Sequence, residues 1–501
     1  MNDDVRRLVY RMNLFEKVED PTDLVTLKSV IAASERPNDL VPLGIKKLVI
    51  SPDASLNVVD SLVDLLGPEL SAKRPKVVIL ADSTQILRNG VDLKATVEAS
   101  LAEFFEVSRI TLGAGTHLYV DDSALDQATK SLDGAAAVVS VGSGTISDIA
   151  KVASDRQGGV PHILVQTAAS VDGYTDNVSV VLKAGAKRTI DSRWPEVVLA
   201  DTDVIASAPI ELNTSGFGEL LSLFTAPADW WLAYQLGTDT TFHSTPRDLL
   251  LTFAGNPGEW GAGISDGNQA AVEQLTRVLA IRGIGTGIAG TTACLSGMEH
   301  LVSHMLDMFA AGNHHEVGLH GKQVGVASVV AATAWEYLLD QISDGREVSI
   351  RSEHADSQNN GANADLEKKV TEVFAAVDPT GALGAECWRD YSKKLEILNA
   401  SAAKIRGLVS SATDIEQALG KTMPNSRDLA NGLTLAGAAY SASQLDEWVT
   451  ADIWKWAVSN CHLMRNRVTI VDLLDAVGWW TEADVDAVLG RVDALIGGLK
   501  K

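Results

Sequence analysis

AAAVVSVGSGTISDIAKVAS, residues 135–154, is the stretch of sequence that decides the fold. An apolar run ends at Gly142 and Gly144, and a helix-like segment begins near Thr145. A short apolar run bounded by glycine is typical of a buried strand, and small residues allow a tight turn into a following helix. We therefore predict a strand, a glycine turn and a helix in this order.

The same pattern is found on both sides of this stretch. KVVILAD (residues 76–82) and PHILVQTAAS (residues 161–170) are apolar runs that lead into acidic or small residues, and helix-like segments lie between the runs. Such alternation is typical of a parallel sheet with crossover helices. After about residue 205 the strand patterns fade and apolar periodicity predicts helices. We expect an α/β N-terminal domain with a parallel sheet, followed by an all-helical C-terminal domain.

We divide the chain into an N-terminal extension (residues 1–70), an α/β domain (71–205) and a helical domain (206–501). The extension has a helical-looking start and a strand candidate at Lys47–Ser51. A polar stretch from Glu347 to Asp365 predicts an exposed loop. Thr481 and Asp484 predict a capping box before the last helix.

The composition excludes several classes of protein. With 501 residues, 46% of them hydrophobic, the chain can form two or three folding units. Its three cysteines lie far apart without a CxxC pair, which indicates no disulfide framework and fits a reducing cytoplasm. We expect neither a signal peptide nor a membrane span. A net charge of −23 without a basic cluster argues against nucleic acid as a partner.

The glycine turn is a candidate site for a pyrophosphate. Backbone amides and the positive end of the helix dipole attract anions at such a turn, and Thr145 adds a hydroxyl donor. The spacing differs from the GxGxxG of the common dinucleotide fingerprint, and similar glycines also occur in tight turns that bind nothing. The motif alone leaves both interpretations open.

Two further polar positions follow predicted strands. QTAASVDGYTD (residues 166–176) offers Thr167, Ser170, Asp172 and Asp176 in one loop of small residues. Asp82 closes the strand KVVILAD, where a carboxylate accepts two hydrogen bonds from a ribose diol and repels a phosphate. A carboxylate at this position favours NAD over NADP. The alternative is that Asp82 only stabilises a turn or caps a helix and binds no cofactor.

A candidate metal site is spread over the helical part of the chain. Its members are Glu219, His300, His304 and His320. His300 and His304 are four residues apart, so both lie on one helix face. A carboxylate and imidazoles with an open coordination position can polarise an alcohol or carbonyl oxygen. Histidines in apolar helices are more often core or surface residues, and spacing alone leaves that alternative open.

Six motifs resemble, in their order, those of sn-glycerol-1-phosphate dehydrogenases, which belong to the superfamily of dehydroquinate synthases and iron-type alcohol dehydrogenases. They are GSGTISDIAK, TAASVDGYTD, LADTDVIASAP, SGFGELLS…ADWWLA, SGMEHLVSHMLD and HGKQVG. The similarity covers roughly residues 75 to 340, and a weaker similarity is found near the C-terminal end in HLMRNRVTIVDLLDAVGWWTE.

The resemblance implies that residues 71–205 bind a nucleotide, that residues 206–501 bind metal and substrate, and that the active site lies in the cleft between the two domains. It assigns the metal to Glu219, His300 and His320, and it places His304 and Asp172 against the substrate as catalytic residues. The implied cofactor residues are Asp82, Gly142, Gly144, Thr145, Asp148, Thr167, Ser170 and Asp176.

The implied reaction interconverts dihydroxyacetone phosphate, or a related ketone phosphate, and sn-glycerol 1-phosphate, or a related polyol phosphate, with NAD or NADP. In relatives the metal is usually zinc, with nickel or iron in some, and the family leads us to expect a homo-oligomer.

Three departures from the family pattern keep two alternatives open. Glu219 stands at a position where glycerol-1-phosphate dehydrogenases carry aspartate and dehydroquinate synthases carry glutamate. Asp176 replaces a serine of the family, and its added carboxylate is unfavourable there unless it is paired. Residues 292–297 (TACLSG) lack an arginine that the family pattern predicts. The chain is also longer than common relatives, through the extension and insertions near 237–280 and 345–365. The alternatives are a dehydroquinate synthase-like lyase that uses NAD and metal, and a catalytically degenerate binding homologue.

Overall fold

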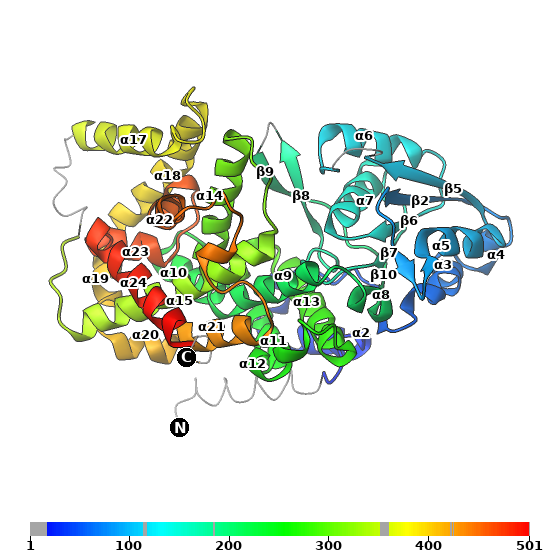
Figure 1. Cartoon of the computed structure of the whole chain (residues 1–501), viewed down its shortest axis with the longest axis horizontal. Helices are drawn as coiled ribbons and strands as arrows, with labels where there is room; N and C mark the ends of the chain where they lie inside the picture. Colours follow the sequence, from blue (N-terminus) through cyan, green and yellow to red (C-terminus); the bar gives the residue numbers. More distant parts are fainter. Residues whose placement is uncertain are drawn as a thin grey trace. The chain divides into compact units, whose positions relative to one another are not determined.

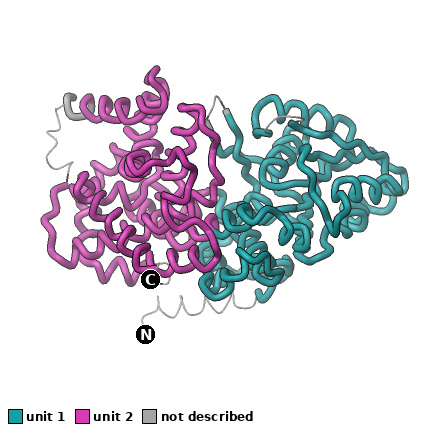
Figure 2. Tube along the Cα trace, in the orientation of Figure 1, with its two compact units in different colours: residues 1–217, 244–290 teal, residues 218–243, 291–501 magenta. Residues whose placement is uncertain are grey.

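The computed structural model describes residues 18–113, 118–183, 186–350, 360–420, 423 and 425–499. The chain forms two compact units (Figure 2): unit 1 comprises residues 1–217 and 244–290, and unit 2 comprises residues 218–243 and 291–501. The predicted division at residues 70 and 205 stays a prediction, because compactness describes packing and not which residues bind nucleotide or metal. The helical start expected for the extension lies outside the described residues.

Unit 1 is built on a six-stranded sheet in the order β1-β10-β7-β6-β2-β5, and Figure 1 labels every strand of this sheet except β1. Its strands are β1 (Lys47–Ser51), β2 (Lys76–Asp82), β5 (Glu106–Leu112), β6 (Ala137–Gly142), β7 (His162–Gln166) and β10 (Val197–Asp201). All neighbouring strands run parallel. The predicted parallel sheet is confirmed, and the strand candidate at Lys47–Ser51 is its edge strand beside β10.

Helices cover both faces of this sheet because its central strands are apolar on both sides. Val77 and Ile79 of β2 belong to one core, with side chains of α3 (Val58–Leu66) and α5 (Leu93–Ala102). Val78 and Leu80 belong to a second core with α6 (Asp122–Ser131) and α7 (Gly144–Arg156). Continuous apolar runs such as KVVILAD are typical of parallel strands that are buried on both faces.

The order of the strands places a switch point between β2 and β6. From β2 the chain continues to β5 on one side, and it returns to β6 on the other side. The register pairs Ala81 with Val141, so Asp82 and Gly142 follow side by side at the carboxyl ends of the two strands. Open α/β sheets bind ligands at such switch points.

The other elements of unit 1 are short hairpins and helices. The antiparallel hairpins, which the sequence pattern did not predict, are β3 (Leu87–Arg88) with β4 (Val91–Asp92) and β8 (Val178–Lys183) with β9 (Ala186–Asp191). The helices are α2 (Leu24–Ala32), α4 (Pro68–Ser71), α8 (Thr202–Ala206), α11 (Ser244–Ala254), α12 (Pro257–Trp260) and α13 (Gln269–Ala289), with 3-10 turns at Pro37–Asp39, Ala54–Asn57 and Gly261–Gly263. Most of the predicted insertion near 237–280 therefore belongs to unit 1.

Unit 2 is helical, as predicted, and no strand occurs after β10 in the described part of the chain. Its helices are the end of α9 (Ile210–Leu220), α10 (Ala226–Leu236), α14 (Met298–Gly312), α15 (His320–Ser343), α17 (Asn360–Phe374), α18 (Ala382–Ala400), α19 (Ala402–Leu408), α20 (Ala412–Leu419), α21 (Ser426–Leu435), α22 (Ala451–Asn460), α23 (Ile470–Ala476) and α24 (Glu482–Leu499). Its described residues also form four 3-10 turns, at Leu221–Phe224, Thr292–Cys294, Ala442–Gln444 and Cys461–Met464. None of the described helices combines the length and apolar character needed to span a bilayer.

Two local predictions at the C-terminal end have different outcomes. The capping box is confirmed, because the Asp484 amide donates to Thr481 Oγ1 at 3.4 Å and the Thr481 amide donates to Asp484 Oδ2 at 2.8 Å. The exposed loop predicted for Glu347–Asp365 is wrong at its end, since α17 begins at Asn360, and residues 351–359 lie outside the described part. Burial of Val370 and Phe374 further along α17 stabilises the helix despite its polar start.

Candidate metal and nucleotide sites

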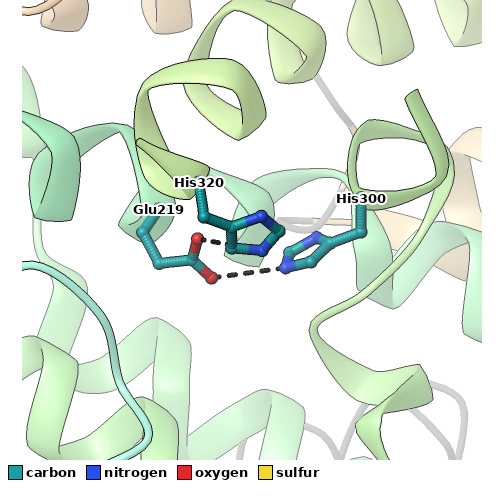
Figure 3. Close-up of side chains that lie close together, drawn as sticks. All are labelled: Glu219, His300 and His320. Carbon is teal, nitrogen blue, oxygen red and sulfur yellow. Dashed lines mark hydrogen bonds and ion pairs between the residues drawn. The ribbon is translucent and has the colours of Figure 1, made fainter. Parts of the chain in front are cut away.

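The three predicted metal ligands lie together in unit 2 (Figure 3). Glu219 comes from the end of α9, His300 from the first turn of α14, and His320 is the first residue of α15. Candidate ligand atoms of all three lie within 4.8 Å of one another, and no other such group occurs among the described residues. The Nε2 atoms of His300 and His320 lie 3.3 Å and 3.7 Å from Glu219 Oε1 and Oε2.

Two glycines allow α9 and α15 to approach closely enough for this arrangement. A Cβ on Gly218 would collide with the carbonyl oxygen of Gly321, and a Cβ on Gly325 would lie 2.8 Å from the Cα of Gly218. The glycines of SGFGELLS and HGKQVG therefore bring Glu219 beside His320.

The electrostatics of the cluster favour positive charge. Burial alone would lower the pKa of His300, but the carboxylates of Glu219 and Glu299 on its two sides raise it to about 9. His300 and Glu219 are only 7% and 3% exposed. Two imidazole nitrogens and a carboxylate suit zinc and neighbouring divalent metals, so the residues present fit such an ion, which would displace the proton from His300.

His304 lies one helical turn after His300 and is half-buried. Its ring stacks on that of His320 at a centroid distance of 5.7 Å and lies 6.4 Å from the ring of His300. The structure thus brings the predicted catalytic imidazole beside the candidate ligands. Its role in proton transfer stays a prediction.

Asp172, the other predicted catalytic residue, belongs to unit 1 and forms an ion pair there. Arg282 of α13 donates from Nε to Asp172 Oδ2 at 3.1 Å, and the arginine side chain is fully buried. A Cβ on Gly283 would collide with the Asp172 carbonyl oxygen, so α13 packs tightly against this loop. Sequence reasoning missed Arg282, although a lone charge in the apolar segment AIRGIGTGIA indicates a buried partner.

The carboxyl ends of β2, β6 and β7 bring several predicted cofactor residues together in unit 1. Asp82 and Gly142 are neighbours by register, and the Thr167 amide donates to the Gly142 carbonyl at 3.2 Å. A Cβ on Gly142 would lie 2.8 Å from that of Ile146, so the first turn of α7 can pack on the strand only because residue 142 is glycine. Gly144 and Thr145 open α7, whose N-cap Ser143 forms no side-chain cap hydrogen bond.

Ser170 and Asp82 are engaged within the protein. The hydroxyls of Ser170 and Tyr174 lie 3.2 Å apart. Asp82 accepts from Lys94 Nζ at 2.5 Å and from Thr84 Oγ1 at 2.8 Å. These are the contacts of a turn aspartate, the alternative that the sequence left open, and binding of a ribose by Asp82 stays a prediction.

Asp148 and Asp176 are paired through Lys151, a residue that sequence reasoning missed. Lys151 Nζ lies 2.6 Å from Asp176 Oδ1 and 3.3 Å from Asp148 Oδ1, and it donates to the Gly173 carbonyl at 2.7 Å. Burial opposes the charge of Lys151, but the two carboxylates outweigh it and raise its pKa. The pairing that Asp176 needs is therefore present, and the signal for it is a lone lysine in the apolar segment ISDIAKVAS.

Replacing Asp176 with asparagine should alter the pH dependence of stability. Burial raises the pKa of Asp176 to about 7 despite Lys151. Between pH 4 and 7 the folded chain then holds a proton that the unfolded chain releases, so this stabilisation is present at low pH and is lost as pH rises. Relative to D176N, the wild type should lose up to about 4 kcal/mol over that range, since a pKa change of one is worth about 1.4 kcal/mol.

Urea unfolding of both proteins between pH 4 and 8 measures this difference. The matched control is D155N, at an exposed aspartate near the end of α7, which should follow the wild type. Parallel wild-type and D176N curves would contradict the prediction.

The segment 292–297, which lacks the arginine expected from the resemblance, is contacted by an arginine from elsewhere in the chain. Arg467 donates to the Ser296 carbonyl at 2.6 Å and to Thr292 Oγ1 at 2.8 Å. Arg467 belongs to the C-terminal segment HLMRNRVTIVDLLDAVGWWTE, which is weakly similar to the family pattern. It lines a polar cavity of unit 2 together with Asp229 and Asp239.

The chain is similar in sequence to several known proteins. A family model described as iron-containing alcohol dehydrogenase matches residues 55–209. The glycerol-1-phosphate dehydrogenase (NAD(P)+) of Methanothermobacter thermautotrophicus is 31% identical over 254 residues, which are 50% of this chain and 70% of that protein. The enzyme of the same name from Haloquadratum walsbyi is 34% identical over 218 residues, which are 42% of this chain and 61% of that protein.

A solved structure extends the likeness to almost the whole chain. An alcohol dehydrogenase from an archaeal halo-thermophilic source in a Red Sea brine pool aligns with a TM-score of 0.51 and 12% identity, covering 90% of this chain and 98% of that one. At such low identity the likeness shows the fold alone, which is an α/β part followed by a helical part.

Proposed function

The chain belongs to the glycerol-1-phosphate dehydrogenase family within the iron-type alcohol dehydrogenases, and from this premise we propose that it is a metal-dependent, NAD(P)-linked dehydrogenase. It interconverts dihydroxyacetone phosphate, or a related small ketone phosphate, and sn-glycerol 1-phosphate, or the related polyol phosphate. The observation that carries the proposal is the convergence of Glu219, His300 and His320 from three helices that are distant in sequence.

The metal would be held by Glu219, His300 and His320, with zinc favoured and nickel or iron as alternatives. Such an ion supplies a Lewis acid that polarises the substrate's oxygen. His304 lies beside two of these residues and would exchange a proton at the reacting hydroxyl, a task that suits imidazole near neutral pH. Asp172, fixed by Arg282, would assist that proton transfer.

The nucleotide would bind at the switch point of the sheet. Amides of Gly144 and Thr145 at the start of α7 would hold the pyrophosphate, and Asp82 would accept from the ribose. Lys94 Nζ lies 2.5 Å from Asp82 Oδ1 and offsets the charge of this carboxylate. Asp82 therefore does not exclude the 2′-phosphate of NADP. Thr167 and Ser170 belong to the loop that follows β7 and would contact the cofactor. Asp148 and Asp176 would act indirectly, because they pair with Lys151, which holds that loop in place.

The three cysteines are buried and form no disulfide, which fits a reducing cytoplasm. We expect a homo-oligomer, as in the family.

The enzyme, reconstituted with Zn²⁺, should consume NADH or NADPH in proportion to the ketone phosphate supplied. Loss of NADH absorbance measures this directly, and a panel of ketone phosphates with both nucleotides identifies the substrate. The second candidate, a dehydroquinate synthase-like lyase, is favoured by the glutamate at position 219. A lyase reduces and reoxidises NAD within one turnover, so product formation without net change in NADH would contradict the dehydrogenase. A degenerate homologue would bind nucleotide and metal without turnover.

A further inference from the structure

Two groups behind the candidate ligands determine which nitrogen of each imidazole faces the cluster. We propose that Glu299 and the hydroxyl of Ser303 are positioning residues that orient His300 and His320 toward a shared divalent cation, and that Glu299 contributes the larger share of its affinity. The inference deepens the metal-binding part of the proposed function and rests on it.

Glu299 fixes the orientation of His300. Its carboxylate is fully buried and accepts from the Gly297 amide at 2.6 Å, from Thr225 Oγ1 at 2.9 Å and from His300 Nδ1 at 3.0 Å. Since a carboxylate only accepts, Nδ1 must carry a proton, and metal binding then uses the lone pair of Nε2. That atom is the one that faces Glu219.

Ser303 has the same effect on His320 through a neutral chain of hydrogen bonds. Its hydroxyl donates its one proton to Gln323 Oε1 at 2.6 Å, and both side chains are buried. The hydroxyl oxygen can therefore only accept from His320 Nδ1, at 2.9 Å. Nδ1 again carries the proton, and Nε2 presents its lone pair toward Glu219.

The two positioning residues, Glu299 and Ser303, differ in charge. Glu219 and Glu299 are 3% and 0% exposed, so a bound dication between them would form a neutral buried group. Removing the charge of Glu299 would leave a net positive group in a buried position, which is costly. Ser303 orients its histidine without adding charge. Glu299 should therefore contribute more to affinity than Ser303.

The test measures the dissociation constant of Zn²⁺ on the full chain by competition with a fluorescent chelator. E299Q should weaken binding about 100-fold and S303A about tenfold, the two ends of the range usual for groups that support metal-ligating histidines. The visible absorption of bound Co²⁺ should change in E299Q, because it reports the geometry around the ion. A purely structural role would instead lower the melting temperature of the metal-free chain and leave affinity and spectrum unchanged.

The matched control is E336Q, a carboxylate on α15 that accepts from the amide and hydroxyl of Ser426. It lies 16 residues after His320, about 24 Å along the helix, and its replacement should leave affinity unchanged. Equal weakening by E336Q would overturn the proposal, because net charge would then explain the effect.

Wild-type affinity in E299Q would also overturn it. If E299Q fails to fold, T225V removes one hydrogen bond to the same carboxylate and should weaken binding by a smaller factor, and unchanged affinity there would count against the proposal. A wild-type chain without affinity for any divalent metal would overturn the metal-binding part of the proposed function itself.

Discussion

Replacing His300 or His320 with alanine should remove both the bound metal and the turnover. Each imidazole is one of three converging donors, so its removal leaves only two of the three candidate ligands. A Lewis acid supplies several kcal/mol to such a reaction, so turnover should fall by at least about a thousandfold. Metal per chain, measured by mass spectrometry, and NADH oxidation are the two readouts.

His304→Ala should separate catalysis from metal binding. Its ring contacts the rings of both His300 and His320, but it is not part of the ligand group. Turnover should fall about 10²- to 10⁴-fold, the usual worth of a positioned acid or base, with the metal retained. H314N is the control, since His314 is exposed and has a φ of 60° that asparagine tolerates. Retained metal in both H300A and H320A would refute the ligand assignment.

Replacing Lys151 with methionine should cost about 3–5 kcal/mol of stability. Its fully buried ammonium is the shared partner of Asp148 and Asp176, and it also donates to the carbonyls of Gly173 and Val178. Removing one partner of a buried ion pair leaves the other charge uncompensated, which is the costly way to break it. Methionine retains the volume of the stem, so the loss reports charge and hydrogen bonds more than packing.

Urea unfolding at neutral pH measures this loss. K130M, the same change at an exposed lysine of α6, should have almost no effect. The double variant K151M/D176N should be more stable than K151M, because it removes one of the two carboxylates that lose their partner. A K151M chain as stable as K130M would show that the buried triad contributes nothing.

Local sequence was sufficient to predict those strands and helix caps that a short segment forms by itself. Strands β1, β2, β6 and β7 follow from short, mostly apolar runs, and the capping box at Thr481 follows from two residues three positions apart. The hairpin of β8 and β9 was missed because β9 (AKRTID) has no such run, although β8 contains VSVVL. The start of α17 was missed because apolar residues ten or more positions later stabilise it.

The sequence by itself determined the order of strands and helices and the residue types of the candidate metal site, because apolar runs, glycine turns and motif order are properties of neighbouring residues. Only the tertiary structure decided which distant groups these arginine and lysine side chains contact. Arg282 and Asp172 are 110 positions apart, Arg467 and Ser296 are 171 apart, and Lys151 and Asp176 are 25 apart. Such pairs depend on how helices and loops pack, since a buried charge needs a partner close in space, wherever that partner lies along the chain.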